Sequence, residues 1–317
     1  MLNPDSVKYH KPVVILGAGA WGKTLASLVA QNRHGGYSVR LWSRQSSESL
    51  REVFAEKAHI VVSAVSMAGV RPLIERLKAL PPFAANTIFV TATKGLDPFT
   101  CQTPSQIWQE AFMSEAVVVL SGPNLSKEIQ QGLPAAAVAA SSNEAIAKQV
   151  QAAFSSEKFR VYTNTDPLGV ELGGTLKNVM AIAAGTCDGL QLGTNAKAAL
   201  LTRGLAEIIR VGTDWGAKAE TFYGLSGLGD LLATCNSSLS RNYQVGYQLA
   251  QDKTLSHILA HLEGTAEGVN TTSVLVERAN RQGVSVPITY QVYRLLKGEI
   301  SPKAAVEALM LRDTKPE

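Results

Sequence analysis

The chain has 317 residues, of which 45% are hydrophobic and 18% are charged, a composition typical of a globular protein with two domains. Its 30 basic and 26 acidic residues give a net charge of +4, and the lack of basic runs interleaved with aromatics argues against a nucleic-acid partner. No stretch reaches about 18 apolar residues, which excludes a membrane span, and the mild positive charge suits a small anionic ligand.

The cysteines and the N-terminus both indicate a cytoplasmic protein. Cys101, Cys187 and Cys235 lie far apart without metal-ligand spacing, which is typical of reduced thiols and predicts no bound metal. Residues 1–11 are polar and lack the apolar core of a signal peptide. We therefore expect the protein to remain in the cytoplasm.

The first predicted strand, residues 13–16, is a continuous apolar run, as expected for a strand buried on both faces. It leads directly into the sequence Gly-Ala-Gly-Ala-Trp-Gly, which opens an apolar helix. In this dinucleotide-binding pattern, Gly17 permits the turn, Gly19 lets a pyrophosphate approach the backbone, and Gly22 lets the helix pack closely. The helix N-terminus then offers free N–H groups to the phosphates.

The second predicted strand, residues 38–42, ends in Ser43 and Arg44. A site specific for NAD usually has a carboxylate here to bind the ribose hydroxyls. A carboxylate would repel a 2′-phosphate, whereas an arginine attracts it. The sequence thus favours NADP(H), with NAD(H) also possible; the alternative is that Arg44 is a solvated loop cation.

Polar residues follow the later strands of the first half. Lys94 follows a predicted strand at 87–91, and Gly122 and Asn124 follow one at 117–120. Because ligands of an open parallel sheet lie beyond the carboxyl ends of its strands, these three residues are candidate ligand contacts. The other predicted elements are strands at 58–65, 135–140 and 159–162 and helices at 70–80 and 143–153.

After Asp166 and Pro167, which are typical of a helix start, strand patterns nearly vanish. Apolar-periodic segments occur at 169–184, 196–215, 244–251, 271–282, 289–297 and 302–311. We predict an α/β protein in which a doubly wound, Rossmann-type sheet domain (residues 1–166) binds a dinucleotide. An all-α C-terminal domain (residues 167–317) follows it and binds the substrate.

Lys177 is the only formal charge in the small and apolar stretch 172–187. Such a helix is expected to be buried on most sides, and burial lowers the pKa of a lysine. Gly173 and Gly174 let another backbone or a ligand come close. Although most helical lysines are solvated surface charges, these neighbours make Lys177 a candidate proton donor at the junction of the domains.

Asp230 is a lone carboxylate in a predicted glycine-rich loop, residues 224–232. It can pair with Lys177, keeping that ammonium charged and aimed. The alternative is an aspartate that caps a helix or forms a local turn.

A predicted loop at 238–243 comes just ahead of another helix. Ser240 can cap that helix, which leaves Arg241 and Asn242 in its first turn. An arginine opposes the helix dipole there, so its position suggests a bound phosphate; the alternative is a surface arginine. Glu267 opens a further helix, where it can reach a ribose or nicotinamide amide or act as a cap.

Together these segments resemble the bacterial-type NAD(P)-dependent glycerol-3-phosphate dehydrogenases. The shared motifs occur in the family's order from Val13 to Thr272: Gly-Ala-Gly-Ala-Trp-Gly, Ala-Thr-Lys-Gly-Leu, Leu-Ser-Gly-Pro-Asn, Gly-Gly-Thr-Leu-Lys-Asn-Val, Gly-Leu-Gly-Asp-Leu, Ser-Arg-Asn-Tyr and Glu-Gly-Val-Asn-Thr. The resemblance implies reversible reduction of dihydroxyacetone phosphate to sn-glycerol 3-phosphate for phospholipid synthesis, by a cytoplasmic homodimer.

The resemblance also implies roles for individual residues. Lys177 would be the general acid and base at the C2 oxygen, with Lys94 and Asp230 beside it. Substrate contacts would come from Lys94, Gly122, Asn124, Lys177, Asp230, Ser240, Arg241 and Asn242. Cofactor contacts would come from Gly17, Gly19, Ala20, Trp21, Gly22, Arg44, Lys94, Ser126, Arg241 and Glu267.

One segment departs from the family pattern. Family members usually carry a longer, Asn-rich insert after the second strand, whereas about fifteen residues separate Trp42 from Ala58 here. Because that loop lies on the adenosine side, the departure affects the expected cofactor preference rather than the chemistry.

Two other functions fit parts of the pattern. A related two-domain reductase of a hydroxy acid or ketopantoate shares the fold and the lysine, but it requires carboxylate recognition in place of the phosphate contacts at 240–242. A non-catalytic NADP-binding sensor would bind the cofactor without turnover, and it leaves the buried lysine unexplained.

Overall fold

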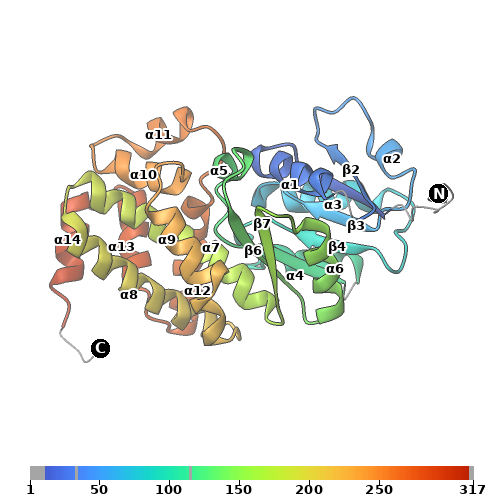
Figure 1. Cartoon of the computed structure of the whole chain (residues 1–317). Coiled ribbons are helices and arrows are strands. Elements are labelled where there is room, and N and C mark those ends of the chain that lie inside the picture. The colour runs from blue at the N-terminus through green and yellow to red at the C-terminus, as the bar shows by residue number, and fades with distance from the viewer. Residues whose placement is uncertain (1–10, 33–34, 114–115, 314–317) are drawn as a thin grey trace. The chain divides into compact units, whose positions relative to one another are not determined.

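The computed structural model describes residues 11–32, 35–113 and 116–313, which form two compact units (Figure 1). The predicted absence of a signal peptide rests on residues that, apart from Lys11, lie outside this description. Unit 1 comprises the described residues up to Thr93, Ser105–Leu120 and Ser126–Pro167. Unit 2 comprises Lys94–Pro104, Ser121–Leu125 and the described residues from Leu168 onward. Two loops of the first half thus belong to unit 2, and the domain ranges 1–166 and 167–317 stay a prediction.

Unit 1 is built on one seven-stranded sheet with the order β2-β1-β3-β4-β5-β6-β7. Its strands are β1 (Lys11–Leu16), β2 (Tyr37–Trp42), β3 (Ile60–Ser63), β4 (Ile88–Thr91), β5 (Val117–Ser121), β6 (Ala135–Ala140) and β7 (Phe159–Asn164). β1 pairs in parallel with both β2 and β3, so the strand order reverses at β1. This reversal is the place where open α/β sheets bind nucleotides.

Helices cover both faces of this sheet. They are α1 (Ala20–Gln31), α2 (Leu50–Val53), α3 (Met67–Lys78), α4 (Pro104–Phe112), α5 (Ser126–Gln130) and α6 (Glu144–Phe154). Val13 and Ile15 of β1 pack in one core cluster with α1 and α6, whereas Val14 and Leu16 pack in another with α3 and α4. Because successive strand residues point to opposite faces, this division confirms the predicted doubly wound fold.

Every regular element described from Pro167 onward is helical, as predicted. The α-helices are α7 (Pro167–Gly189), α8 (Gly193–Asp214), α9 (Asp230–Cys235), α10 (Arg241–Leu249), α11 (Leu255–His261), α12 (Glu267–Gln282), α13 (Pro287–Leu296) and α14 (Pro302–Met310). A 3₁₀ turn, η1 (Ala219–Tyr223), and a π-helical turn, η2 (Leu225–Gly229), precede α9. None of the described helices is long and apolar enough to cross a membrane.

Two glycines bring the backbones of α7 and α10 into direct contact. A Cβ on Gly185 of α7 would lie 2.0 Å from the Tyr243 carbonyl oxygen of α10. A Cβ on Gly246 of α10 would lie 1.8 Å from the Ile182 carbonyl oxygen of α7. Both distances are far below van der Waals contact, so only glycine permits this packing. The contact holds α10 against the helix that carries Lys177.

A buried carboxylate caps α13 from another helix. Glu207 of α8 is 1% exposed, and its two oxygens accept hydrogen bonds from the backbone N–H groups of Ile288 and Thr289, each 2.9 Å long. The N-cap residue of α13, Val286, has no side-chain oxygen to do this. Glu207 therefore stabilises α13 as an N-cap residue would.

We expect Glu207→Ala to lower the free energy of unfolding by about 2–4 kcal/mol, because two buried N–H groups lose their acceptors. Urea denaturation measures this change. The control is Glu299→Ala, whose partly exposed carboxylate pairs with Arg294 at 3.6 Å and should contribute less than about 1 kcal/mol. Equal effects of the two variants would contradict the capping role.

Candidate active site

The glycine loop of unit 1 joins β1 to α1. Gly17 has φ +117°, and a Cβ there would lie 2.6 Å from the Ala64 carbonyl oxygen. A Cβ on Gly22 would lie 1.7 Å from the Gly17 carbonyl oxygen, so the third glycine packs on the first. A Cβ on Gly19, in contrast, would meet no described atom within 4 Å.

The space in front of Gly19 fits a dinucleotide pyrophosphate. Gly19 is the N-cap residue of α1, and no side chain bonds to the first N–H groups of the helix. Those groups, which carry partial positive charge, are therefore available to an anion. Ala20 is exposed and Trp21 half-buried at the same helix end.

Ser126 begins α5, which packs against α1 within unit 1. Gln130 at the end of α5 donates hydrogen bonds to the Ala20 carbonyl oxygen (3.3 Å) and the Thr24 hydroxyl (2.8 Å). The predicted cofactor residue Ser126 thus lies on a helix that contacts the start of α1. The sequence prediction did not identify α5, because five residues are too few to show helical periodicity.

Arg44 lies in an ordered turn after β2. The turn is closed by hydrogen bonds between Ser43 and Ser46, and the Trp42 indole N–H donates to the Glu48 carbonyl oxygen at 2.9 Å. Arg44 itself is exposed. The backbone N–H of Gly17 donates to the Trp42 carbonyl oxygen at 2.7 Å, so this turn begins beside the glycine loop.

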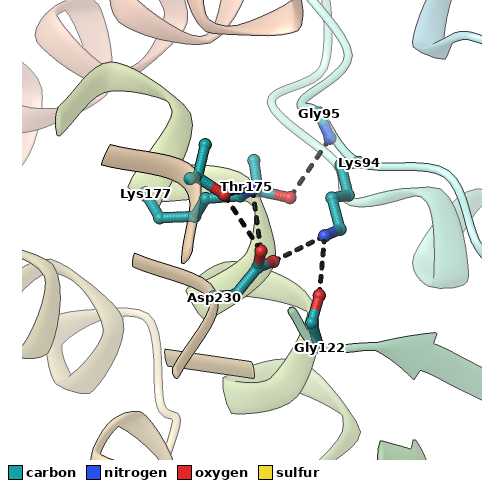
Figure 2. A network of polar contacts seen from close by, with 7 residues as sticks. Lys94, Gly95, Gly122, Thr175, Lys177 and Asp230 are labelled. Atoms are coloured by element: carbon teal, nitrogen blue, oxygen red, sulfur yellow. Dashed lines mark hydrogen bonds and ion pairs between the residues drawn. The ribbon is translucent and has the colours of Figure 1, made fainter. Parts of the chain in front are cut away.

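The predicted catalytic residues lie together in unit 2 (Figure 2). Lys177 Nζ lies 2.9 Å from Asp230 Oδ1, and Lys94 Nζ lies 2.5 Å from Asp230 Oδ2. Lys94 also donates to the Gly122 carbonyl oxygen at 3.3 Å. Lys177 is 6% exposed and Asp230 1%. The expected burial of Lys177 and its pairing with Asp230 are therefore confirmed; the catalytic roles stay predictions.

This cluster has two cations and one anion, so a positive charge remains for a ligand. Burial lowers the pKa of Lys177, Asp230 raises it and the positive charge of Lys94 lowers it, and the net result is a pKa of about 8. Such a lysine is charged at neutral pH and gives up its proton readily, as a general acid must.

Asp230 is the first residue of α9, not part of a loop as the sequence suggested. It follows the π-helical turn η2, which packs against α7: a Cβ on Gly173 would lie 2.9 Å from the Ser226 carbonyl oxygen. Ser226 and Asp230 are four residues apart, as are Gly173 and Lys177. The two segments therefore run side by side, and this brings the carboxylate to the lysine.

Lys94 is fixed from two sides. The backbone N–H of Gly95, which has φ +142°, donates to the Thr175 hydroxyl at 3.1 Å (Figure 2). A Cβ on Gly174 would lie 2.3 Å from Ser121 Oγ and 3.3 Å from Lys94 Cε. The close approach at Gly174 is thus made by side chains, Ser121 first and then Lys94, rather than by the backbone or ligand that the sequence predicted.

The sequence analysis missed Thr234, which completes the cluster. Lys177 Nζ donates to the Thr234 hydroxyl, and that hydroxyl donates to Asp230 Oδ1 at 3.1 Å. The lysine is thereby held from two directions. The available signal was the spacing of four residues between Asp230 and Thr234, which places both on one face of a helix.

Two polar side chains beside this cluster lack partners among the described residues. Ser121 Oγ and both amide atoms of Asn124 are buried and form no hydrogen bond there. They flank Gly122, whose carbonyl oxygen accepts from Lys94. Because buried polar groups are normally satisfied, these atoms fit contacts to a polar ligand.

The N-terminus of α10 carries the residues of the predicted anion site, which stays a prediction. Ser240 Oγ accepts from the Tyr243 backbone N–H at 3.2 Å, which confirms the predicted cap. Asn242 Oδ1 accepts from the Gly268 N–H at 2.9 Å, one residue after Glu267 begins α12. Arg241 is exposed.

The start of α12 connects this site to α7. A Cβ on Gly268 would lie 2.7 Å from the Asn178 carbonyl oxygen and 2.8 Å from Asn242 Oδ1. Asn178 follows Lys177 directly on α7. Through Gly268, the N-terminus of α10 is thus connected to the residue of α7 that follows Lys177.

The chain is similar to proteins of one family. A model described as the NAD-dependent glycerol-3-phosphate dehydrogenase N-terminus matches residues 12–57 and 48–147, and the corresponding C-terminus model matches residues 166–307. A glycerol-3-phosphate dehydrogenase (NAD(P)+) from Trichormus variabilis is 64% identical over 96% of this chain and 98% of that protein. One from Synechocystis sp. is 61% identical over 96% and 95%. The crystal structure of the Coxiella burnetii glycerol-3-phosphate dehydrogenase has a TM-score of 0.89 and 33% identity, covering 96% and 99% of the two chains.

Proposed function

This chain belongs to the NAD-dependent glycerol-3-phosphate dehydrogenase family, and we propose that it interconverts dihydroxyacetone phosphate and sn-glycerol 3-phosphate. The observation that carries the proposal is the buried ammonium of Lys177, bonded to Asp230 and Thr234 beside the unpartnered side chains of Ser121 and Asn124. The open glycine loop of unit 1 fits a dinucleotide.

Lys177 acts on the oxygen of the substrate in this proposal. The bound nicotinamide cofactor supplies a hydride to C2 of the ketone. Negative charge grows on the C2 oxygen, and Lys177 donates its proton to that atom. Asp230 and Thr234 hold the Lys177 ammonium in place, and Lys94 adds a second positive charge. A fixed cation in a nearly dry site stabilises a developing oxyanion strongly.

The phosphate of the substrate binds at the start of α10. Arg241 supplies a guanidinium there, and Ser240 and Asn242 fix the helix end through hydrogen bonds. The free N–H groups of the helix add positive potential. The Asn124 amide and the Gly122 backbone orient the rest of the molecule. Anchoring the phosphate places the ketone for reaction and lowers the entropy of the step.

The test follows loss of NADPH and NADH absorbance with dihydroxyacetone phosphate and, separately, with phosphate-free dihydroxyacetone. We expect rapid oxidation of cofactor with the phosphorylated ketone and a rate lower by orders of magnitude with the other. The ketopantoate-type alternative predicts turnover of an oxo acid, and the sensor alternative predicts binding without turnover. Either result would contradict the proposed reaction and support the corresponding alternative.

Reduction should slow as pH rises through about 8. Lys177 must be protonated to act as the acid, and its pKa is lowered to about 8. The reverse reaction needs the neutral amine, so oxidation of glycerol 3-phosphate should speed up over the same interval. Measuring kcat/KM in both directions between about pH 6 and pH 10 tests this, and profiles that do not mirror each other would contradict it.

We propose NADP(H) as the preferred cofactor, with NAD(H) also used. Arg44 is exposed at the end of β2 beside the glycine loop, where it can pair with a 2′-phosphate. The N-terminal family model matches in two pieces that overlap at 48–57, within the short connection after Trp42. This connection contains α2, which is capped by Ser49, where the family resemblance implies a longer loop. Arg44→Gln should raise KM for NADPH about tenfold and leave KM for NADH nearly unchanged; equal changes would argue against this preference.

The remaining expectations rest on family membership. We propose a cytoplasmic homodimer that supplies a precursor of phospholipids. The three cysteines are free, which suits a reducing compartment. Light scattering of the purified protein measures the oligomeric state.

A further inference from the structure

A polar cluster outside the residues assigned above joins α7, α8 and α10 within unit 2. The carboxylate of Asp188 on α7 accepts from the Tyr243 hydroxyl at 2.7 Å and pairs with Lys197 Nζ at 2.6 Å. Lys197 Nζ also lies 5.5 Å from the centre of the Tyr243 ring. The Asp188 carboxylate thus has two partners, and none of these three residues belongs to the group of Lys94, Lys177 and Asp230.

Its location connects the two parts of the proposed substrate site. Asp188 and Lys177 are eleven residues apart on α7, which is about three turns and about 16 Å along one face of the helix. Tyr243 directly follows Arg241 and Asn242, and its backbone N–H is the donor in the Ser240 cap. One hydrogen bond therefore links the helix that carries the acid to the phosphate-binding turn.

We propose that Tyr243 is a positioning residue, whose hydrogen bond to Asp188 sets where the phosphate-binding turn of α10 lies relative to Lys177. This inference rests on the proposed function. Without the bond, the start of α10 still has the Ser240 cap and the Asn242 contact to Gly268. What it loses is the hydrogen bond from the Tyr243 hydroxyl to Asp188, while further along α10 the Thr186 hydroxyl of α7 still donates to the Gly246 carbonyl oxygen at 3.3 Å.

The surroundings of Tyr243 keep its hydroxyl protonated, so that it donates to Asp188. Burial raises the pKa of Tyr243, and the hydrogen bond to Asp188 raises it further, so the hydroxyl stays a donor at all working pH values. Lys197 holds the carboxylate from the other side.

The test compares Tyr243→Phe with Tyr247→Phe. The first removes the hydroxyl and keeps the ring, and the second makes the same change on the ring stacked beside it, 6.1 Å away. For Tyr243→Phe we expect KM for dihydroxyacetone phosphate and the inhibition constant of inorganic phosphate to rise about tenfold, with kcat changed less than about threefold. Turnover of phosphate-free dihydroxyacetone should not change. For Tyr247→Phe all constants should stay at their original values.

A double-mutant cycle with Asp188→Ala separates positioning from general destabilisation. Asp188→Ala removes this bond together with the ion pair to Lys197, so the double variant should raise KM no further than Asp188→Ala alone. Unchanged KM and phosphate inhibition in Tyr243→Phe, or an equal loss with both ketones, would overturn the inference. If the original protein does not reduce dihydroxyacetone phosphate, the proposed function fails by itself. Calorimetric binding of inorganic phosphate to the original protein and to Tyr243→Phe then still decides the role of Tyr243.

Discussion

Replacing Lys177 with alanine should lower kcat for dihydroxyacetone phosphate by about 10²–10⁴-fold, the usual contribution of a general acid. The side chain is 6% exposed and is held by Asp230 and Thr234, so alanine removes a proton donor that the fold has positioned. Steady-state kinetics measure kcat, and fluorescence titration measures cofactor affinity, which should change little because the glycine loop lies in unit 1.

Lys148→Ala is the matched control for this prediction. Lys148 pairs with Glu144 at 2.8 Å on the surface of α6, with 60% of its side chain exposed. Its removal should leave kcat unchanged. A Lys177→Ala protein that keeps more than about a tenth of the original kcat would show that another group donates the proton.

Asp230→Asn should lower kcat/KM by about 10²–10³-fold. Asp230 is the carboxylate partner of both Lys94 and Lys177, and loss of one partner from a buried ion pair costs about 3–5 kcal/mol. Because the negative charge raises the pKa of Lys177, its removal should move the pH at which reduction slows to below about 8. The pH profile of kcat/KM therefore distinguishes an electrostatic role of Asp230 from a merely structural one.

The control for Asp230→Asn is Glu277→Gln, which removes a surface charge paired with Arg281 at 3.1 Å. It should change neither the rate nor its pH dependence. An Asp230→Asn protein with reduced activity but an unshifted pH profile would contradict the proposed coupling between this carboxylate and Lys177.

Local sequence patterns were sufficient for the architecture of the first half. The buried run of β1 and the glycines after it could be interpreted because each depends on residues nearby in the chain. A strand buried on both faces must be apolar throughout. Residue 22 must be glycine because a Cβ there would collide with the Gly17 carbonyl oxygen, five residues earlier. Lys177 was identified for a similar reason. A long apolar helix is buried on most sides, so few of its positions let a single charged side chain reach solvent.

The structure around Asp230 was not predictable in the same way. Residues 224–229 are rich in glycine and suggest a loop, yet Leu225–Gly229 form the π-helical turn η2. Tertiary packing determines this: a Cβ on Gly227 would lie 2.0 Å from the Phe222 carbonyl oxygen, and Gly173 of α7 packs against Ser226. No pattern within residues 224–229 contains that information. Thr234 was missed because its role exists only once α9 is formed.

The backbone contact between α7 and α10 limits how this protein can diversify. At Gly185 and Gly246 even a methyl group would collide with a carbonyl oxygen of the opposite helix. A larger residue at either position would force the two helices apart. This would move Lys177 on α7 away from the proposed anion site at the start of α10. Evolution toward longer or shorter substrates must therefore leave these two positions alone and proceed through the loops, where added atoms meet solvent instead of main chain.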